Sequence, residues 1–307
     1  MNGGAAKRLA PLQILLAGAL WGTMGLFIHR LDAVFGFTSM QIVFTRAVCS
    51  AVLLALVLLT RGFAGFKLRL RDVWCFLGTG LASIVFFNFC YFRAIMLTSM
   101  AVAAALLYTA PVFVGLISRV VFREALTARK VAAMCAALVG CFLTTGIVGN
   151  LGGVNAEGVL YGVGAGLGYA LYSIFSRCAL DRGYRPLTIA FYTFAVAAAG
   201  TALFAAPGAM LTSVVSASPV NIALLVVFAL VTTVLPFLFY TTGLQNVAPG
   251  KASILASVEP VVAALIGVAV LREKMPPLTA AGVAIVVISI ALLQLPGKKT
   301  HEKEELP

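Results

Sequence analysis

The sequence is poor in charged residues, and poorest in acidic ones. Charged side chains make up 10% of the 307 residues, with 10 Asp and Glu against 22 Lys and Arg. A soluble domain usually carries charge on about a quarter of its residues. The composition therefore excludes an ordinary soluble domain, and a hydrophobic fraction of 62% indicates a protein that lies in a membrane.

Groups that form catalytic or cofactor sites are also scarce. The two histidines, His29 and His301, lie far apart in the sequence, so a catalytic or metal-binding cluster is not predicted. The six cysteines form no Cys-x-x-Cys motif and are interpreted as small apolar filler. The absence of a Walker A sequence argues against an ATP-driven pump. We expect no enzyme activity, no cofactor and no metal.

Long apolar runs, bounded by charges, Gly or Pro, dominate the chain. A crossing helix needs about 20 apolar residues, and these runs are apolar on every face, which is typical of helices and not of barrel strands. We predict ten spans: Leu12–His29, Ser39–Thr60, Asp72–Ala94, Met100–Val121, Thr127–Ile147, Ala156–Arg177, Pro186–Ala206, Pro219–Thr242, Gly250–Leu271 and Pro277–Leu295. The segment from Pro207 to Ser218 is predicted to be a loop, and residues 298–307 a disordered cytoplasmic tail.

The two halves of the chain carry the same signature at an offset of 149 residues. Pro111 followed by Arg123–Glu124 matches Pro260 followed by Arg272–Glu273. We therefore predict a duplication, with one repeat over residues 1–149 and the other over 150–297. Because each repeat holds an odd number of spans, the second copy must cross the membrane upside down, so the repeats are inverted. The two glutamates are interpreted as helix-end anchors.

The basic residues indicate an orientation in the membrane, and not a nucleic-acid partner, because they form no continuous stripe. With the amino terminus inside, seventeen of the 22 Lys and Arg residues fall in segments on the inner side. The positive-inside rule then places both termini in the cytoplasm. The expected partners are the lipid bilayer and a small-molecule substrate, and a homodimer is compatible with the sequence.

Glu259 is the acidic residue placed deepest in a predicted span, roughly 14 Å from the cytoplasmic start of its helix. An ionised carboxylate near the midplane costs about 2.5 to 3.5 kcal/mol, so it should face a wet cavity, pair with a cation or be protonated. We interpret Glu259 as part of the substrate path and of proton coupling; a structural carboxyl bonded to nearby backbone is the alternative. Arg46 lies at a similar depth, and it could pair with Glu259, bind carbonyls or bind substrate.

Pro111 and Pro260 lie in mid-span, where each leaves a backbone carbonyl without its helical donor. Kinks at both positions are predicted to mark the transport path, and plain structural kinks are the alternative. Polar and aromatic residues at similar depths could surround an amphipathic metabolite: Asn88, Tyr91, Tyr108, Thr109, Tyr172, Tyr240, Ser253 and Ser257. For any single one of them, helix packing or a place in an interfacial belt is the competing interpretation.

These motifs resemble the EamA family of the drug/metabolite transporter superfamily. The resemblance rests on Trp21–Gly22, Arg46, Tyr91–Ala94, Leu106–Pro111 and Glu124 in the first half, and on Ser257–Pro260 with Glu273 in the second. It implies two inverted five-helix halves around a central cavity, and ATP-independent movement of amino acids, other metabolites, sugars or drugs. It also implies a cavity that draws on Trp21, Asn88, Tyr91, Tyr108, Tyr172, Tyr240, Ser253 and Glu259. The repeats are chemically unequal, because the first half has Ala110 where the second has Glu259.

The sequence thus predicts an all-α integral membrane protein with ten transmembrane helices in two inverted repeats around a central cavity. The functional hypothesis is a secondary-active exporter of amino acids or related metabolites in the cytoplasmic membrane, working by alternating access with proton coupling. A multidrug efflux permease is the nearest alternative. A membrane enzyme would need clustered acids, bases or metal ligands, and a scaffold would need neither kinked helices nor a midplane carboxylate.

Overall fold

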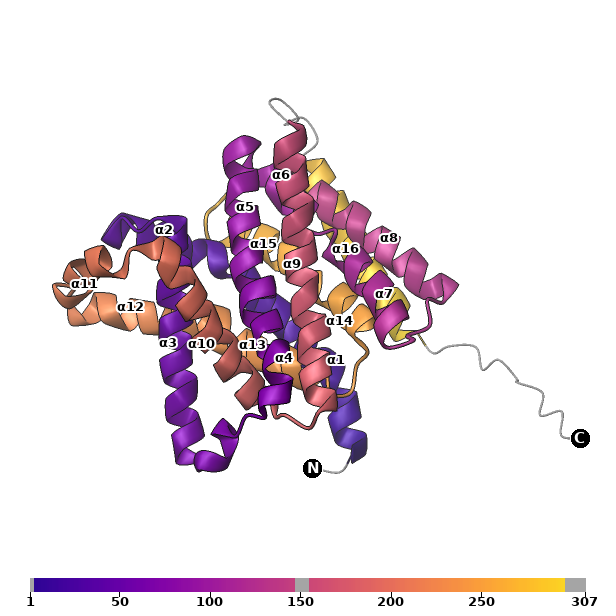
Figure 1. Ribbon diagram of the computed structural model, residues 1–307. Helices are drawn as coiled ribbons and strands as arrows, with labels where there is room; N and C mark the ends of the chain where they lie inside the picture. Colours follow the sequence, from indigo (N-terminus) through magenta and orange to yellow (C-terminus); the bar gives the residue numbers. More distant parts are fainter. Residues whose placement is uncertain (1–2, 147–154, 296–307) are drawn as a thin grey trace, which may run out of the picture.

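The computed structural model describes residues 3–146 and 155–295, and the regular structure in these two ranges is helical. The first half forms α1 (Gly3–Gly22), α2 (Met24–Phe35), α3 (Ser39–Thr60), α4 (Val73–Leu77), α5 (Phe86–Leu97), α6 (Met100–Leu107), α7 (Ala110–Val121) and α8 (Ala128–Thr144). The second half forms α9 (Ala156–Asp181), α10 (Pro186–Ala205), α11 (Pro207–Val215), α12 (Pro219–Ala229), α13 (Leu235–Gly243), α14 (Pro249–Ala256), α15 (Val258–Ala269) and α16 (Pro277–Gln294). Figure 1 shows their arrangement.

Nine helical segments of the described ranges are long and apolar enough to cross a membrane. They correspond to nine of the ten predicted spans. The remaining prediction, Thr127–Ile147, coincides with α8, which has 17 residues and extends for about 26 Å, slightly less than a typical hydrocarbon core. Ile147 itself lies outside the described residues. The protein is therefore an all-α, multi-pass membrane protein, and the tenth crossing stays a prediction.

Short polar residues and prolines set the beginnings of the helices. Thr38 caps α3 with a capping box, in which its hydroxyl accepts from Gln41 N–H at 3.4 Å and Gln41 Oε1 accepts from Thr38 N–H at 2.9 Å. Pro207 begins α11, so the predicted loop at this position was wrong. The fixed φ of proline suits a first helical turn, and Ala206, with a φ of 47°, turns the chain out of α10.

The first predicted span is longer than expected and is interrupted. Helical residues run from Gly4 to Phe35, with a break at Thr23 between α1 and α2. The Leu20 carbonyl accepts from both the hydroxyl and the amide of Thr23, at 2.7 and 3.1 Å. The predicted tail, residues 298–307, lies outside the described residues.

Irregular helix turns recur at the repeat offset of 149 residues. The break between α6 and α7 begins at Tyr108, and the break between α14 and α15 is at Ser257, its equivalent. Two π-helical segments, Gly78–Val85 and Leu230–Val234, also end at equivalent positions, because Val85 and Val234 lie 149 residues apart. Such turns often occur at functional sites. The recurring irregularities therefore direct attention to the region where these helices meet.

The helix contacts come in two sets that the repeat offset interchanges. The first helix of each half packs against elements of the other half: α1 against α13, α14 and α15, and α9 against α5, α6 and α7. On opposite sides of the helix bundle, equivalent helices pair with one another, α3 with α10 and α8 with α16, as Figure 1 shows. Each half therefore contributes to one shared centre.

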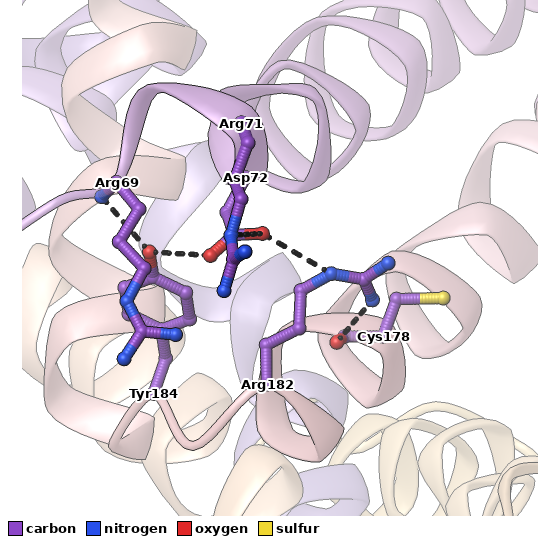
Figure 2. Close-up of polar contacts among 6 residues, drawn as sticks. All are labelled: Arg69, Arg71, Asp72, Cys178, Arg182 and Tyr184. Atoms are coloured by element: carbon purple, nitrogen blue, oxygen red, sulfur yellow. Dashed lines mark hydrogen bonds and ion pairs between the residues drawn. The ribbon is translucent and has the colours of Figure 1, made fainter.

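A buried carboxylate joins the halves at one end of the helices (Figure 2). The side chain of Asp72, before α4, is 4% exposed, and its Oδ1 lies 3.3 Å from Arg182 Nε in the loop after α9. The Tyr184 hydroxyl donates to Asp72 Oδ2 at 3.0 Å and accepts from Arg69 N–H at 3.0 Å. Burial raises the pKa of Tyr184, and the bond to Asp72 adds to the rise, so the phenol stays a donor. The guanidinium of Arg182 also lies 4.7 Å from the centre of the Trp74 ring.

Candidate functional site

A small cavity lies where the two helix breaks meet. Its lining residues belong to the breaks and to α9: Tyr108, Ala110, Pro111, Tyr169, Ser253, Ala256, Ser257 and Glu259. Its volume is about 10 Å³, which is the room that about one water molecule needs. The cavity in this conformation is therefore too small for a metabolite, and a substrate would fit only after the surrounding helices move apart.

Glu259 lies in the first turn of α15 and is partly buried. The hydroxyl of Tyr169, on α9, donates to Glu259 Oε2 at 3.1 Å. α1 passes close to α15 here, because a Cβ atom at Gly22 would lie 2.7 Å from the carbonyl oxygen of Glu259. A negative charge is also favoured near the first turn of a helix by the helix dipole. The carboxyl group is thus fixed where α1, α9 and α15 meet.

Trp21 forms an aromatic wall beside this carboxyl group. Its ring is buried, and the ring centre lies 6.0 Å from that of Tyr169, 5.2 Å from that of Phe237 and 5.5 Å from that of Tyr240. Aromatic pairs in such tilted and edge-on arrangements contribute about 0.5–1.5 kcal/mol each beyond their buried area. Trp21 is therefore held firmly between α9 and α13, in contact with the tyrosine that binds Glu259.

Two hydroxyl pairs hold α9 against α13. Tyr172 Oη lies 2.7 Å from Thr241 Oγ1, and Ser173 Oγ lies 2.7 Å from Tyr240 Oη. All four residues are buried. Because these hydroxyls bond one another, the polar groups of Tyr172 and Tyr240 position the two helices in this conformation, and a contact with substrate stays a prediction for both.

The side chains of four other predicted residues donate hydrogen bonds to backbone carbonyls of their own helical segment. The bonds run from Asn88 to Ile84, Thr109 to Leu106, Ser253 to Gly250 and Ser257 to Ser253, at 2.7, 2.6, 3.0 and 3.4 Å. Hydroxyls that bond to a preceding carbonyl are common where a helix bends. Of the four, Ser253 and Ser257 also line the cavity.

Arg46, on α3, is buried at 6% exposure. Its Nη1 lies 3.5 Å from the sulfur of Met24, which is a weak acceptor. Among the residues that the structure describes, it has no acidic partner, and in particular no ion pair with Glu259. Arg93, by contrast, lies 3.8 Å from Glu157. Arg46 is therefore a buried cation whose charge is not balanced by a neighbouring carboxylate.

The structure brings together only part of the predicted set. Tyr108, Ser253, Ser257 and Glu259 line one cavity with Pro111, and Trp21 and Tyr240 pack beside it. The other predicted residues, which do not line it, are Arg46, Asn88, Tyr91, Thr109, Tyr172 and Pro260. Tyr91 instead packs on Phe87, with ring centres 5.8 Å apart.

Tyr169 lies on the same predicted helix face as Tyr172 and Ser173, but the sequence does not single it out as a site residue. Its helical spacing places it one turn from Tyr172, but nothing in the sequence shows that α9 faces α15. The described residues contain no group of three or more His, Cys, Asp or Glu side chains that could hold a metal ion.

Comparison with known proteins identifies relatives of this arrangement. The model of the EamA-like transporter family matches twice, over residues 8–146 and 156–295. An uncharacterized transporter of Archaeoglobus fulgidus is 28% identical over 85% of this chain and 87% of its own length. The uncharacterized transporter YyaM of Bacillus subtilis is 23% identical over 84% and 86%. A solved structure titled "Crystal structure of protein" has the same fold, with a TM-score of 0.73 and 22% identity over 93% of this chain and 96% of that one.

Proposed function

The chain belongs to the EamA-like transporter family, and we propose that it exports amino acids or related small metabolites across the cytoplasmic membrane by secondary-active transport. That it is a multi-pass membrane transporter follows from the family and from the apolar helices. The observation that carries the finer proposal is Glu259, a partly buried carboxylate on a cavity at the break between α14 and α15. An ionisable group at such a place is the usual mark of a substrate or proton path.

The proposed mechanism is alternating access by two inverted repeats. In support of it, the family model matches each half separately, and the repeat offset interchanges the two sets of helix contacts. In such transporters broken helices place the substrate near the midplane, and one half rocks against the other. The cavity between the breaks, at about 10 Å³, then belongs to a conformation without room for substrate. Rocking of the halves would enlarge this cavity toward one side of the membrane at a time.

The chemistry around the cavity fits a substrate with an ammonium group and an apolar part. Glu259 supplies the negative charge for the ammonium group, and the rings of Trp21 and Tyr169 supply an apolar wall that also attracts cations. An amino acid carries a carboxylate as well. We assign that group to Arg46, which lies outside the lining of the closed cavity; its buried guanidinium has no acidic partner among the described residues and would gain one from a substrate that reaches it when the helices move apart.

Proton coupling follows if Glu259 holds either a proton or the substrate ammonium group, but not both. A protonated carboxyl group has no charge to attract the ammonium group, so the two ligands exclude each other. A proton that enters from outside then displaces the substrate, and the substrate displaces the proton on the inner side. Outward movement of substrate is thereby linked to inward movement of protons.

Counterflow in liposomes tests this function. Purified protein is reconstituted into vesicles that are loaded with a mixture of unlabelled amino acids, and labelled amino acids are supplied outside in trace amounts. We expect transient accumulation of the label that protein-free vesicles do not show. Absence of counterflow for every amino acid tested would overturn the substrate class.

Multidrug efflux is the second candidate, and the aromatic wall favours it. Trp21, Tyr169, Phe237 and Tyr240 form a cluster that would bind a flat organic cation as well as a small amine. The same vesicles discriminate the two. Uptake of a fluorescent quaternary amine without amino-acid counterflow would identify a drug permease.

A further inference from the structure

The repeated Arg–Glu signature ends α7 and α15 in the same way. Arg123 and Arg272 both adopt the left-handed region, with φ of 54° and 57°. The following amides fold back, so that Glu124 N–H donates to the Ser118 carbonyl at 3.2 Å and Glu273 N–H to the Gly267 carbonyl at 3.0 Å. A left-handed residue that closes such a bond is a common helix ending, although it is costly for a residue other than glycine. The two glutamates thus leave equivalent points on equivalent helices.

In the first copy this glutamate reaches the other half of the molecule. Glu124 Oε2 accepts from the amide of Gly250, in the first turn of α14, at 3.1 Å, and Oε1 bonds to the ammonium group of Lys130. The two side chains are only 13% and 8% exposed. Gly250 permits this approach, because a Cβ atom there would contact Lys130 and lie 3.1 Å from Glu124 Oε2. The contact therefore ties the end of α7 to the start of α14.

In the second copy the equivalent glutamate is not engaged in this way. The offset pairs Glu273 with the first turn of α6, where Ala101 replaces Gly250. A Cβ atom is excluded at Gly250 chiefly by the side chain of Lys130, and because the second copy has Thr279 in place of Lys130, an alanine there leaves Glu273 room to approach. Glu273 is exposed and lies over its own helix, since a Cβ atom at Gly267 would be 2.5 Å from its Oε2. It borders an open cavity of about 170 Å³ together with Thr279, the equivalent of Lys130. In the described residues, Glu124 thus holds the end of α7 against the start of α14, a contact that we call a latch, whereas Glu273 makes no such contact with α6.

We propose that Glu124 and Glu273 are the two gate residues of the transport cycle and that they act in turn. Glu124 bound to α14 closes the end that the charge distribution assigns to the cytoplasm. When the halves rock, Glu124 releases α14, and Glu273 binds the first turn of α6 and closes the outer end. The inference rests on alternating access as the mechanism of this transporter, but on no particular substrate.

The two latches are unequal, and this inequality sets the resting state. Lys130 gives Glu124 a buried counter-ion, whereas Thr279 offers Glu273 only a hydroxyl. A charge-assisted bond is roughly twice as strong as a neutral one. The conformation closed at the Glu124 end, which is the one observed, is therefore the more stable of the two.

Hydrogen–deuterium exchange in nanodiscs tests the latch without any substrate. In the Glu124→Gln variant, Lys130 is left buried without its counter-ion, so the closed end should open. Peptides from the first turn of α14 should exchange about tenfold faster, and those from the first turn of α6 should exchange more slowly. Gly250→Ala keeps both charges but places a methyl group against them, and it should have the same effect. Glu157→Gln, which removes a surface carboxylate 58% exposed, is the matched control and should change neither segment.

Adding Glu273→Gln to the Glu124→Gln variant tests the second latch. The slower exchange at the start of α6 should then disappear, because the carboxylate that binds it is gone. If α14 exchanges as in the wild type in both the Glu124→Gln and the Gly250→Ala variants, or if α6 stays protected in the double variant, the proposal is overturned. Should these shifts occur in a protein that moves no amino acid, the gate stands and the proposed substrate class fails.

Discussion

Replacement of Glu259 by Gln separates proton coupling from substrate passage. Glutamine has the same size as glutamate and keeps a carbonyl oxygen that can accept the Tyr169 hydroxyl, which lies 3.1 Å from Glu259 Oε2. It cannot bind a proton. The packing against α1 should also survive, because Gly22 faces the backbone carbonyl of residue 259 and not its side chain. The variant should therefore fold and insert as the wild type does.

The size of the effect follows from this geometry. The change removes the charge that attracts the substrate ammonium group and also weakens the Tyr169 bond. A hydrogen bond to a charged group exceeds one to a neutral group by about 1 kcal/mol, so each of the two losses should lower the exchange rate at low substrate concentration by about fivefold. A gradient of about one pH unit supplies about 1.4 kcal/mol, enough for about tenfold accumulation of substrate against one proton. The wild type should approach that ratio in vesicles with an acidic lumen. The Glu259→Gln variant should reach a ratio of about one, while its downhill exchange persists at substrate concentrations high enough to offset the weaker binding.

The assay is accumulation of labelled substrate in vesicles with imposed pH gradients between about pH 5.5 and 8. Tyr169→Phe is the matched control, because it removes the hydrogen bond to Glu259 but keeps the carboxyl group. It should retain pH-driven accumulation. If Glu259→Gln accumulates substrate as the wild type does across this range, Glu259 does not couple transport to protons.

Three further predictions concern charge recognition and packing. Arg46→Gln should lower the preference for an amino acid over its methyl ester by about tenfold or more, whereas Arg93→Gln, which removes a cation already paired with Glu157, should not; competition in the counterflow assay measures both. Asp72→Asn should destabilise the folded protein, because it removes the charge that Arg182 binds; the loss should be only about 1–3 kcal/mol, because Arg182 is partly exposed to solvent. The melting temperature in detergent should therefore fall, and an unchanged value would contradict the role of Asp72 in joining the two halves. Gly168→Ala should lower that melting temperature too, because its Cβ atom would lie 2.9 Å from the Cα of Phe87, whereas Gly25→Ala, with nothing within 4 Å, should leave it unchanged or raise it.

The parts of the fold that the sequence predicts are those that depend on composition and local pattern. Nine apolar runs became long helices because about 20 apolar residues can satisfy their backbone in a membrane only as a helix. The repeat offset was visible because matching residues lie 149 positions apart without a gap. The depth of Glu259 in the membrane comes from counting residues along its helix and stays a prediction, and the structure places the residue on a cavity.

The remaining features depend on contacts between segments far apart in the sequence. Glu124 was interpreted as a helix-end anchor, but its hydrogen bond to Gly250 crosses 126 positions and could not be read from either segment alone. Tyr169 was one of several tyrosines with helical spacing, and only the packing of α9 selects it. The break at Thr23 could not be predicted from the sequence, because no proline lies at this position. The helix in place of the predicted loop after Pro207 was foreseeable, because proline commonly begins a helix.

The backbone is more symmetric than the side chains it carries, and this difference makes the two conformations of the proposed cycle unequal in stability. The helix breaks, the π-helical turns and the left-handed arginines all recur at the same offset, so both conformations of the cycle are built from one scaffold. Two buried charged residues do not recur: Asp72 corresponds to Asn221, and Lys130 to Thr279. Each of these charged groups has an oppositely charged partner, Asp72 with Arg182 and Lys130 with Glu124. In the proposed cycle a symmetric protein would populate its two conformations equally. We expect these unmatched charges to favour the conformation closed at the Glu124 end, from which a proton on Glu259 would start the return.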